Sequence, residues 1–137
     1  MKILVMGLPG SGKSTFAKKL ANDLDALLFN ADEIRSLTKF TDFTPNGRVI
    51  QSKRMCLYAD YECSLGKIVI CDFVCPTERT REIFMADITI WMDTIKESRY
   101  QDTNLLFEKP TTYDFAVTMF SNDQYSSILN NIKNKLS

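Results

Sequence analysis

The sequence predicts an α/β fold in which a doubly wound, mostly parallel five-stranded sheet carries helices on both faces. Short apolar runs alternate with longer segments whose apolar residues recur at helical spacing, as strands linked by crossover helices require. A glycine-rich turn also separates the first apolar run from the first amphipathic segment. Because no repeat, low-complexity tract or Pro/Ser-rich linker divides the chain, we expect one domain over residues 1–137.

The first half of the chain is expected to contain two strands and three helices. Short, unbroken apolar runs predict the buried strands, and apolar residues that recur every three or four positions predict the helices. Asn30 and Asp32 are both suitable N-caps for the second helix. In order, we expect a strand over 2–6, a helix over 13–24, a strand over 26–29, a helix opening at 30–35, a loop over 38–47 and a helix over 48–65.

The second half continues the same alternation. Gly66 is suited to end the third helix, and Thr77 is suited to cap the fourth. We expect Arg79, Arg81 and Glu82 of that fourth helix to be exposed. In order, we expect a strand over 67–73, a helix over 77–85, a strand over 88–92, a fifth strand over 114–120 and a closing helix over 122–136.

Composition excludes several classes of function. Seventeen basic and seventeen acidic side chains cancel, so nucleic acid is not favoured as a partner. The absence of histidine excludes imidazole base catalysis and histidine-bound metal, and the four cysteines lack CxxC spacing. No signal peptide or membrane-spanning run is expected, so we predict a cytoplasmic protein without a membrane partner. The oligomeric state stays open.

Residues 7–15, GLPGSGKST, match the P-loop pattern G-x-x-x-x-G-K-[ST] at every position. Because a predicted strand precedes this run and a predicted helix follows it, the motif predicts a P-loop NTPase fold that binds ATP and Mg²⁺. Backbone N–H groups would cradle the phosphates, Lys13 would contact the β- and γ-phosphates, and the Ser14 hydroxyl would bind Mg²⁺. The residues expected to hold the cofactor are Gly10, Ser11, Gly12, Lys13, Ser14 and Thr15.

Two aspartates lie at the ends of predicted strands, where parallel sheets bind their ligands. Asp32 follows the second strand and is a candidate catalytic base for an acceptor hydroxyl, although it is also a candidate helix cap. Asp72 ends the third strand, as a Walker-B acid does, and is a candidate metal ligand. Either Asp32 or Asp72 could be the main carboxylate around the metal, together with Ser14.

Arginines and aromatic residues surround the expected 38–47 loop. Arg35, Arg48 and Arg54 can bind phosphate or sulfate, and the Phe40 and Phe43 rings can stack on a nucleobase. This combination favours an anionic, nucleotide-like acceptor, although arginines on a solvated helix face would give the same pattern. Lys96 and Arg99 follow the fourth strand, where a lid over the donor phosphates is expected, and Arg99 is therefore a further candidate cofactor ligand.

Together these segments resemble the adenylylsulfate kinase (APS kinase) family, in a compact form. The resemblance covers most of the chain and rests on residues 7–15, 30–35, 43–48 with Gln51 and Arg54, 73–76 and 107–110. It implies a role in sulfate assimilation, with transfer of the ATP γ-phosphate to the 3′-hydroxyl of adenosine 5′-phosphosulfate. It also implies Asp32 as the base and a substrate site built from Arg35, Phe43, Arg48, Gln51, Phe73 and Val74.

The sequence departs from the family pattern at several positions. The family's D-G-D-N motif is replaced by Asn30-Ala31-Asp32-Glu33, and the basic lid is reduced to residues 94–100. Gln51 stands where the family usually has asparagine, and Asp72 where it commonly has a small residue. Two alternatives therefore remain: a P-loop kinase with another acceptor, such as a polynucleotide 5′-hydroxyl, and a nucleotide-binding switch protein without a small acceptor.

Overall fold

The computed structural model describes all residues, 1–137, and contains one sheet with the strand order β2-β3-β1-β4-β5. All neighbouring strands pair in parallel, so the sheet is wholly rather than mostly parallel. The strands are β1 (Lys2–Met6), β2 (Leu27–Asn30), β3 (Val69–Asp72), β4 (Ile88–Met92) and β5 (Phe115–Val117). The α/β fold that the sequence predicts is confirmed.

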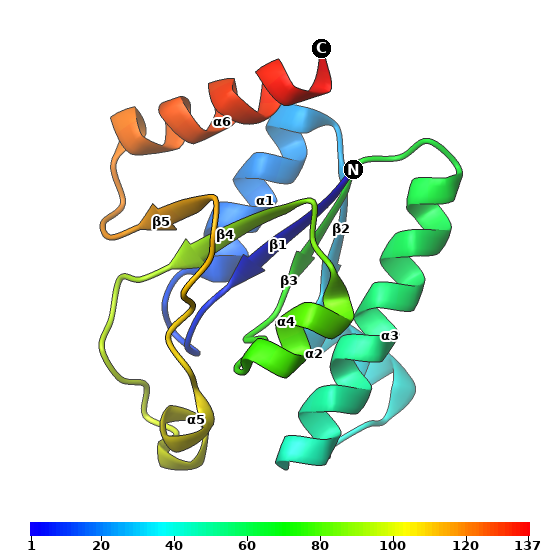
Figure 1. Cartoon of the computed structure of the whole chain (residues 1–137), viewed down its shortest axis with the longest axis vertical. Coiled ribbons are helices and arrows are strands. Elements are labelled where there is room, and N and C mark those ends of the chain that lie inside the picture. The colour runs from blue at the N-terminus through cyan, green and yellow to red at the C-terminus, as the bar shows by residue number, and fades with distance from the viewer.

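Helices cover both faces of this sheet, with α1 and α6 on one side and α3 and α4 on the other (Figure 1). The helices are α1 (Lys13–Leu24), α2 (Ala31–Thr38), α3 (Pro45–Ser64), α4 (Glu78–Phe84), α5 (Gln101–Leu106) and α6 (Asn122–Leu136). No helix combines the length and the apolar character that a membrane span needs.

The central strand β1 explains the two layers of core. Its side chains alternate between the faces of the sheet, as strand geometry requires. Ile3 and Val5 are fully buried in the cluster that includes α1 and α6, while Leu4 and Met6 are fully buried in the cluster that includes α3 and α4. A strand covered on both sides is expected to be continuously apolar, and β1 is apolar after Lys2.

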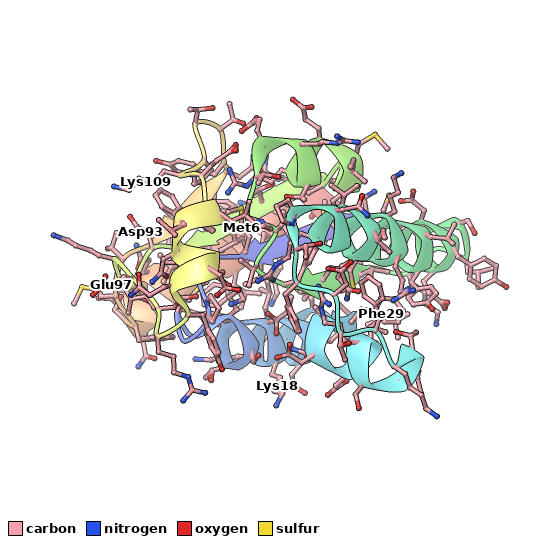
Figure 2. All side chains as sticks on the ribbon, turned by 90° about the horizontal axis from the view of Figure 1, so that it is seen from below. Met6, Lys18, Phe29, Asp93, Glu97 and Lys109 are labelled. Atoms are coloured by element: carbon pink, nitrogen blue, oxygen red, sulfur yellow. The ribbon has the colours of Figure 1, made fainter.

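The connections that leave β1 and β3 run to opposite sides of the sheet. Residues after β1 lead to β2 on one side, and residues after β3 cross β1 to reach β4. Such a switch point opens a crevice beyond the carboxyl end of the central strand. Viewed from this end, Met6 lies at the centre, with α1 on one side of the sheet and α4 on the other (Figure 2).

Three local features differ from the sequence expectations, and two of the differences have a clear physical cause. Helix α3 begins at Pro45, not residue 48, because Thr44 caps it and proline suits the first turn. Strand β5 ends at Val117 rather than continuing to residue 120. Arg81 is not exposed: its guanidinium donates to the carbonyls of Cys75, Pro76 and Glu108, because the chain returns across α4 at that point.

Candidate active site

The P-loop wraps around the amino end of α1. Gly12 has a φ of 92°, a left-handed conformation that glycine adopts without strain, and it forms the N-cap of the helix. A Cβ at Gly12 would overlap the ring of Phe120, so a side chain is excluded on that side as well. The turn thereby directs the first N–H groups and the positive end of the α1 dipole toward one point.

Lys13 reaches back over this loop. Its Nζ donates to the Leu8 carbonyl at 3.0 Å, and the backbone N–H of Ser11 donates to the same oxygen at 3.1 Å. Burial lowers the pKa of Lys13, and the carboxylates of Asp72 and Asp32 partly counteract this effect. The ammonium is thus held in a poorly hydrated place, where an anion would be strongly favoured.

An oxygen-rich cluster lies beside Lys13, at the carboxyl ends of β2 and β3. The Ser14 hydroxyl donates to Asp72 Oδ2 at 2.9 Å, and Asn30 Nδ2 donates to the same oxygen at 2.8 Å. Asp72 is 2% exposed, so its carboxylate depends on these donors. Ser14 and Asp72 supply hydroxyl and carboxylate oxygens, the ligand types that Mg²⁺ prefers.

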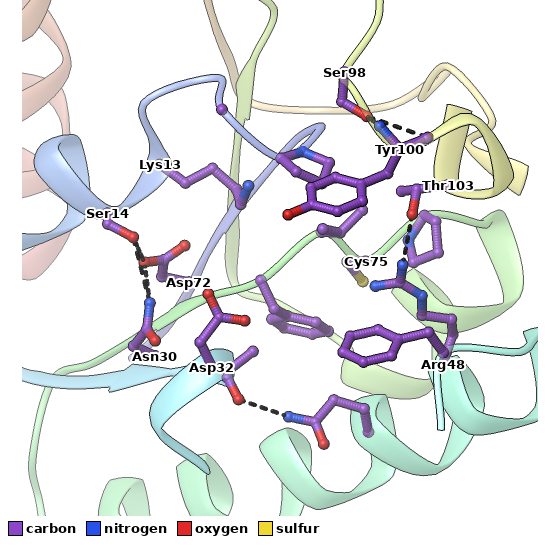
Figure 3. Close-up of a pocket in the computed structure, with 18 of the residues that line it drawn as sticks. Lys13, Ser14, Asn30, Asp32, Arg48, Asp72, Cys75, Ser98, Tyr100 and Thr103 are labelled. Atoms are coloured by element: carbon purple, nitrogen blue, oxygen red, sulfur yellow. Dashed lines mark hydrogen bonds between the residues drawn. The ribbon is translucent and has the colours of Figure 1, made fainter. Parts of the chain in front are cut away.

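Asp32 belongs to the first turn of α2 and projects into the cavity between Lys13 and Arg48 (Figure 3). The helix cap is Asn30, whose Oδ1 accepts from the Glu33 N–H at 3.1 Å. The Asp32 side chain is therefore not needed for capping. Its charge acts on Lys13, Arg35 and Arg48 alike, which makes it the acid shared by the cations of the cavity.

Arg35 and Arg48 both lie against the Phe43 ring. The Arg35 guanidinium carbon lies 4.1 Å from the ring centroid and that of Arg48 lies 5.1 Å from it. Burial is the main cause that lowers the pKa of both arginines, with their mutual repulsion adding to the effect at Arg35. Two cations and an aromatic face thus form one partly dehydrated surface that suits an anion attached to a flat ring.

Polar atoms of this surface remain without partners. Arg35 Nη2, Arg48 Nε and Gln51 Oε1 are buried and make no hydrogen bond, although each residue uses another atom in one. A buried unpaired polar atom costs roughly 1–3 kcal/mol, and these three border the same cavity. They are consistent with a site that a polar ligand completes.

Helix α5 closes the cavity opposite α2. Arg48 Nη2 donates to the Thr103 hydroxyl at 2.9 Å, and Thr103 is 4% exposed. Ser98 and Asn104 tie the preceding turn to the helix: the Ser98 N–H and hydroxyl donate to Asn104 Oδ1, and Asn104 Nδ2 donates to the Ser98 carbonyl. The segment expected to form a lid, residues 94–100, therefore leads directly into a six-residue helix that is joined to Arg48.

The loop between α2 and α3 is held by its own hydrogen bonds. Thr44 donates to Asp42 Oδ1 from both its N–H and its hydroxyl, which lowers the pKa of Asp42. Arg35 Nη1 donates to the Asp42 carbonyl at 2.9 Å. A Cβ at Gly47 would overlap Asp42, so glycine at this buried position lets the loop lie against α3. These contacts place Phe43 over the arginines.

The cavity bounded by these groups has a volume of about 990 Å³. Nearly every residue that the sequence singles out lines it. Arg99 lies at its edge and donates to the Tyr100 hydroxyl at 2.9 Å. Ser11 does not line it, because its side chain is 1% exposed and its carbonyl accepts from Thr94. The lining candidates are Gly10, Gly12, Lys13, Ser14, Thr15, Asp32, Arg35, Phe43, Arg48, Gln51, Asp72, Phe73, Val74 and Arg99.

Sequence reasoning missed several residues at this cavity. Asn30 is expected only as a helix cap, and its contact with Asp72 has no sequence signal because the two residues are 42 positions apart. Tyr100, Asp102 and Thr103 line the cavity from the segment that forms α5, whose six residues are too few to show a helical period. Arg54 and Lys96, considered from the sequence, do not line it.

The parallel sheet, the P-loop at its switch point and the arginine-rich surface across the cavity are the features of a P-loop kinase. The chain belongs to the adenylylsulphate kinase family, whose model matches residues 1–112. The predicted class is confirmed: the protein is an ATP-dependent kinase that phosphorylates adenylylsulphate. No curated protein sequence matches the chain.

Solved structures confirm the fold. The protein APE1195 is 20% identical, with a TM-score of 0.83 over 100% of this chain and 97% of its own. The Mycobacterium tuberculosis APS kinase CysC, solved with AMPPNP and APS, is 18% identical, with a TM-score of 0.82 over 96% of each chain. Shikimate kinase from Aquifex aeolicus is 15% identical, with a TM-score of 0.67 over 99% of this chain and 98% of its own.

Proposed function

We propose that the cavity binds Mg²⁺ and ATP at the P-loop and adenosine 5′-phosphosulfate (APS) across from it, and that Asp32 directs the 3′-hydroxyl of APS to the γ-phosphate. The observation that carries this proposal is the position of Asp32, an exposed carboxylate between half-buried Lys13 and the Arg35–Arg48 pair. A base placed between two anion-binding surfaces is what transfer between two phosphate-bearing nucleotides requires.

On the donor side, the triphosphate would bind at the N-terminus of α1. Lys13 would exchange its hydrogen bond to the Leu8 carbonyl for the β- and γ-phosphate oxygens, where its charge balances charge that develops during transfer. Because burial already weakens hydration of this ammonium, it loses little water when the phosphates arrive. Arg99 would approach the same phosphates from the edge of the cavity.

The residues present fit a magnesium ion that arrives with ATP. No group of three or more acids, cysteines or histidines forms a metal cage by itself in this chain. Ser14 and Asp72 would hold the ion, with phosphate and water oxygens completing its shell, which is the usual arrangement for Mg²⁺ at a nucleotide site. The ion would neutralise phosphate charge, and Asp32 would lie near enough to join it through water.

On the acceptor side, APS would satisfy the unpartnered atoms. The planar forks of Arg35 and Arg48 suit the phosphate and sulfate oxygens, since Arg35 Nη2 and Arg48 Nε are free to donate. Phe43 is 48% exposed and Phe73 is 6% exposed, and both line the cavity, where their rings would enclose the adenine with Val74 beside it. Gln51 Oε1 would accept one hydrogen bond from the substrate.

In the transfer step the 3′-oxygen of APS forms a bond to the γ-phosphorus, and the bond from that phosphorus to the β–γ bridging oxygen breaks. The 3′-hydroxyl proton passes to the Asp32 carboxylate, and ADP leaves with the bridging electrons. Lys13 stabilises the charge that moves onto the departing ADP. The product is 3′-phosphoadenosine 5′-phosphosulfate.

The experiment that tests this proposal follows product formation with four acceptors. The protein is incubated with ATP, Mg²⁺ and either APS, AMP, shikimate or an oligonucleotide with a free 5′-hydroxyl. We expect ADP and 3′-phosphorylated product with APS, and at least a tenfold lower rate with AMP, which lacks the sulfate that the arginines bind. Protein that binds ATP but phosphorylates only another acceptor would overturn the assignment of the acceptor site.

A further inference from the structure

Asn30 joins the two halves of the site. It ends β2 while Asp72 ends β3, and the two residues are register partners in the parallel pair. Asn30 Nδ2 lies 2.8 Å from Asp72 Oδ2 and 3.3 Å from Ser14 Oγ, while Ser14 Oγ lies 2.9 Å from the same carboxylate oxygen. These three side chains form a closed triangle of polar atoms, labelled in Figure 3.

We propose that Asn30 is a positioning residue for the donor site, which orients Asp72 and Ser14 through its amide nitrogen and fixes α2 through its amide oxygen. The oxygen accepts from the N–H of Glu33, so the amide cannot rotate without losing the helix cap. The nitrogen is thereby directed at Asp72. One side chain sets both the oxygens proposed for the metal and the helix that carries Asp32.

The choice of an amide at this position has an electrostatic reason. Aspartate caps a helix as well as asparagine does, so capping alone does not require Asn30. A carboxylate there would however stand against the buried Asp72 carboxylate, and like charges in contact destabilise each other strongly away from water. Asparagine instead donates to Asp72 and leaves one negative charge in the pair. Asp72 Oδ1 accepts no side-chain hydrogen bond and remains available.

A double-mutant cycle tests this inference, using Asn30→Asp, Asp72→Asn and the exchanged double variant. Capping is constant across the cycle, because asparagine and aspartate both cap α2. Calorimetric titration measures ATP affinity with Mg²⁺ and with EDTA, and thermal unfolding without ligand checks the fold. We expect each single change to weaken Mg–ATP binding by roughly 10–100-fold and to leave ATP binding in EDTA within about twofold of the parent.

The exchanged variant decides the matter. It restores one acid and one amide across the same contact. We therefore expect its loss of Mg–ATP affinity to be at least about tenfold smaller than the product of the losses in the two single variants. Losses that simply multiply, or equal losses in Mg²⁺ and in EDTA, would overturn the positioning role. If Asn30→Asp does not fold, Asn30→Ser keeps a hydroxyl cap and removes the amide, and the same Mg²⁺-specific loss is expected.

This inference rests on the proposed function for its donor site, and the two fail differently. If the parent protein binds ATP no more tightly with Mg²⁺ than with EDTA, the proposed donor site is itself overturned and the inference falls with it. Alternatively, the parent shows the Mg²⁺ dependence and converts APS, while the loss of Mg–ATP affinity in the double variant equals the product of the two single losses. In that case only the role of Asn30 is overturned.

Discussion

The two sides of the cavity are built in opposite ways. The phosphate-binding loop of the proposed donor side is one continuous stretch, residues 7–15, whose atoms bond to each other, as Lys13 and Ser11 both do to the Leu8 carbonyl. The acceptor side combines side chains from α2, α3, α5 and the segment after β3. Its buried polar atoms Arg35 Nη2, Arg48 Nε and Gln51 Oε1 have no protein partner.

This difference in construction suggests that the two sides contribute different properties, general triphosphate binding on one side and substrate specificity on the other. Backbone N–H groups recognise any triphosphate in the same way, so the donor side needs few side chains and tolerates little variation in its turn. The proposed acceptor side depends on side chains whose chemistry can vary independently of the fold, and we therefore expect specificity to reside there. We therefore expect substitutions on the two sides to change different kinetic constants, and a substitution of Asp32, which lies between them, to act mainly on the chemical step.

The largest effect is expected for Asp32→Asn. Loss of the base should lower kcat by roughly 10²–10⁴-fold while the thermal stabilisation by ATP stays unchanged. Steady-state rates and thermal unfolding with ATP measure the two quantities. Glu33→Gln is the matched control, because Glu33 is the next residue of α2, is exposed and does not line the cavity. A kcat for Asp32→Asn within about threefold of the parent would exclude a catalytic role for Asp32.

Lys13→Ala should act on the donor side only. We expect kcat/KM for ATP to fall by roughly 10²–10³-fold, since the cation proposed to bind the β- and γ-phosphates is lost, while the affinity for APS is retained. Titration with each nucleotide separately distinguishes the two. Lys18→Ala, an exposed position on the same helix, should leave both unchanged. Equal losses of ATP and APS affinity in Lys13→Ala would contradict the division into two sides.

Arg48→Lys should act on the acceptor side only. Lysine keeps the charge but loses the fork that reaches both the substrate and Thr103, so we expect KM for APS to rise roughly 10–100-fold with KM for ATP unchanged. Arg54→Lys is the control, because Arg54 bonds to Thr38 and lies outside the cavity. A matching rise in KM for ATP would show that Arg48 serves both substrates.

The smallest effect is expected at the amino end of β1, away from both sides. Lys2 Nζ lies 2.8 Å from Asp60 Oδ1, with 7% and 54% of the two side chains exposed. The hydrogen bond from Lys2 lowers the pKa of Asp60. Asp60→Asn should therefore cost about 1 kcal/mol of unfolding free energy at pH 7 and leave kcat unchanged.

The pH dependence of this pair has a definite sign. Because the folded protein holds the pKa of Asp60 below its ordinary value of 3.8, the stabilisation is complete above that value and disappears as the pH falls through the lower one. Urea unfolding of the parent and Asp60→Asn should differ at pH 7 and converge in acid. Glu62→Gln on the same helix should show no such difference. If the difference in unfolding free energy between the parent and Asp60→Asn persisted at acid pH, the stabilisation would not come from the ion pair.

The contrast between the two sides also explains what the sequence could predict. The P-loop is predictable because neighbours in the chain are neighbours in space, and the strand and helix around it, 2–6 and 13–24, have the predicted bounds. The contact of Asn30 with Asp72 depends on β2 lying beside β3, and local patterns do not contain the strand order. The contact of Arg48 with Thr103 depends equally on where α5 docks.

Local sequence patterns also do not predict the exposure of every side chain. The charged pattern of α4 predicts an exposed Arg81, but its side chain is 10% exposed and bonds to three carbonyls. Two of those carbonyls belong to Cys75 and Pro76, just before α4, whereas Glu108 comes near only through the tertiary path of the chain after α5. A helical pattern identifies the apolar face of a helix. It does not show whether another segment of the chain packs over the polar face, as the segment around Glu108 does here.

Gly47 gives the acceptor side an evolutionary vulnerability. It does not line the cavity, yet a single added carbon would displace Asp42, whose carbonyl holds Arg35 and whose neighbour is Phe43. The proposed acceptor site is therefore open to change through a position outside the cavity lining. An added side chain at Gly47 is therefore expected to alter recognition of the acceptor indirectly, by moving Asp42 and with it Arg35 and Phe43.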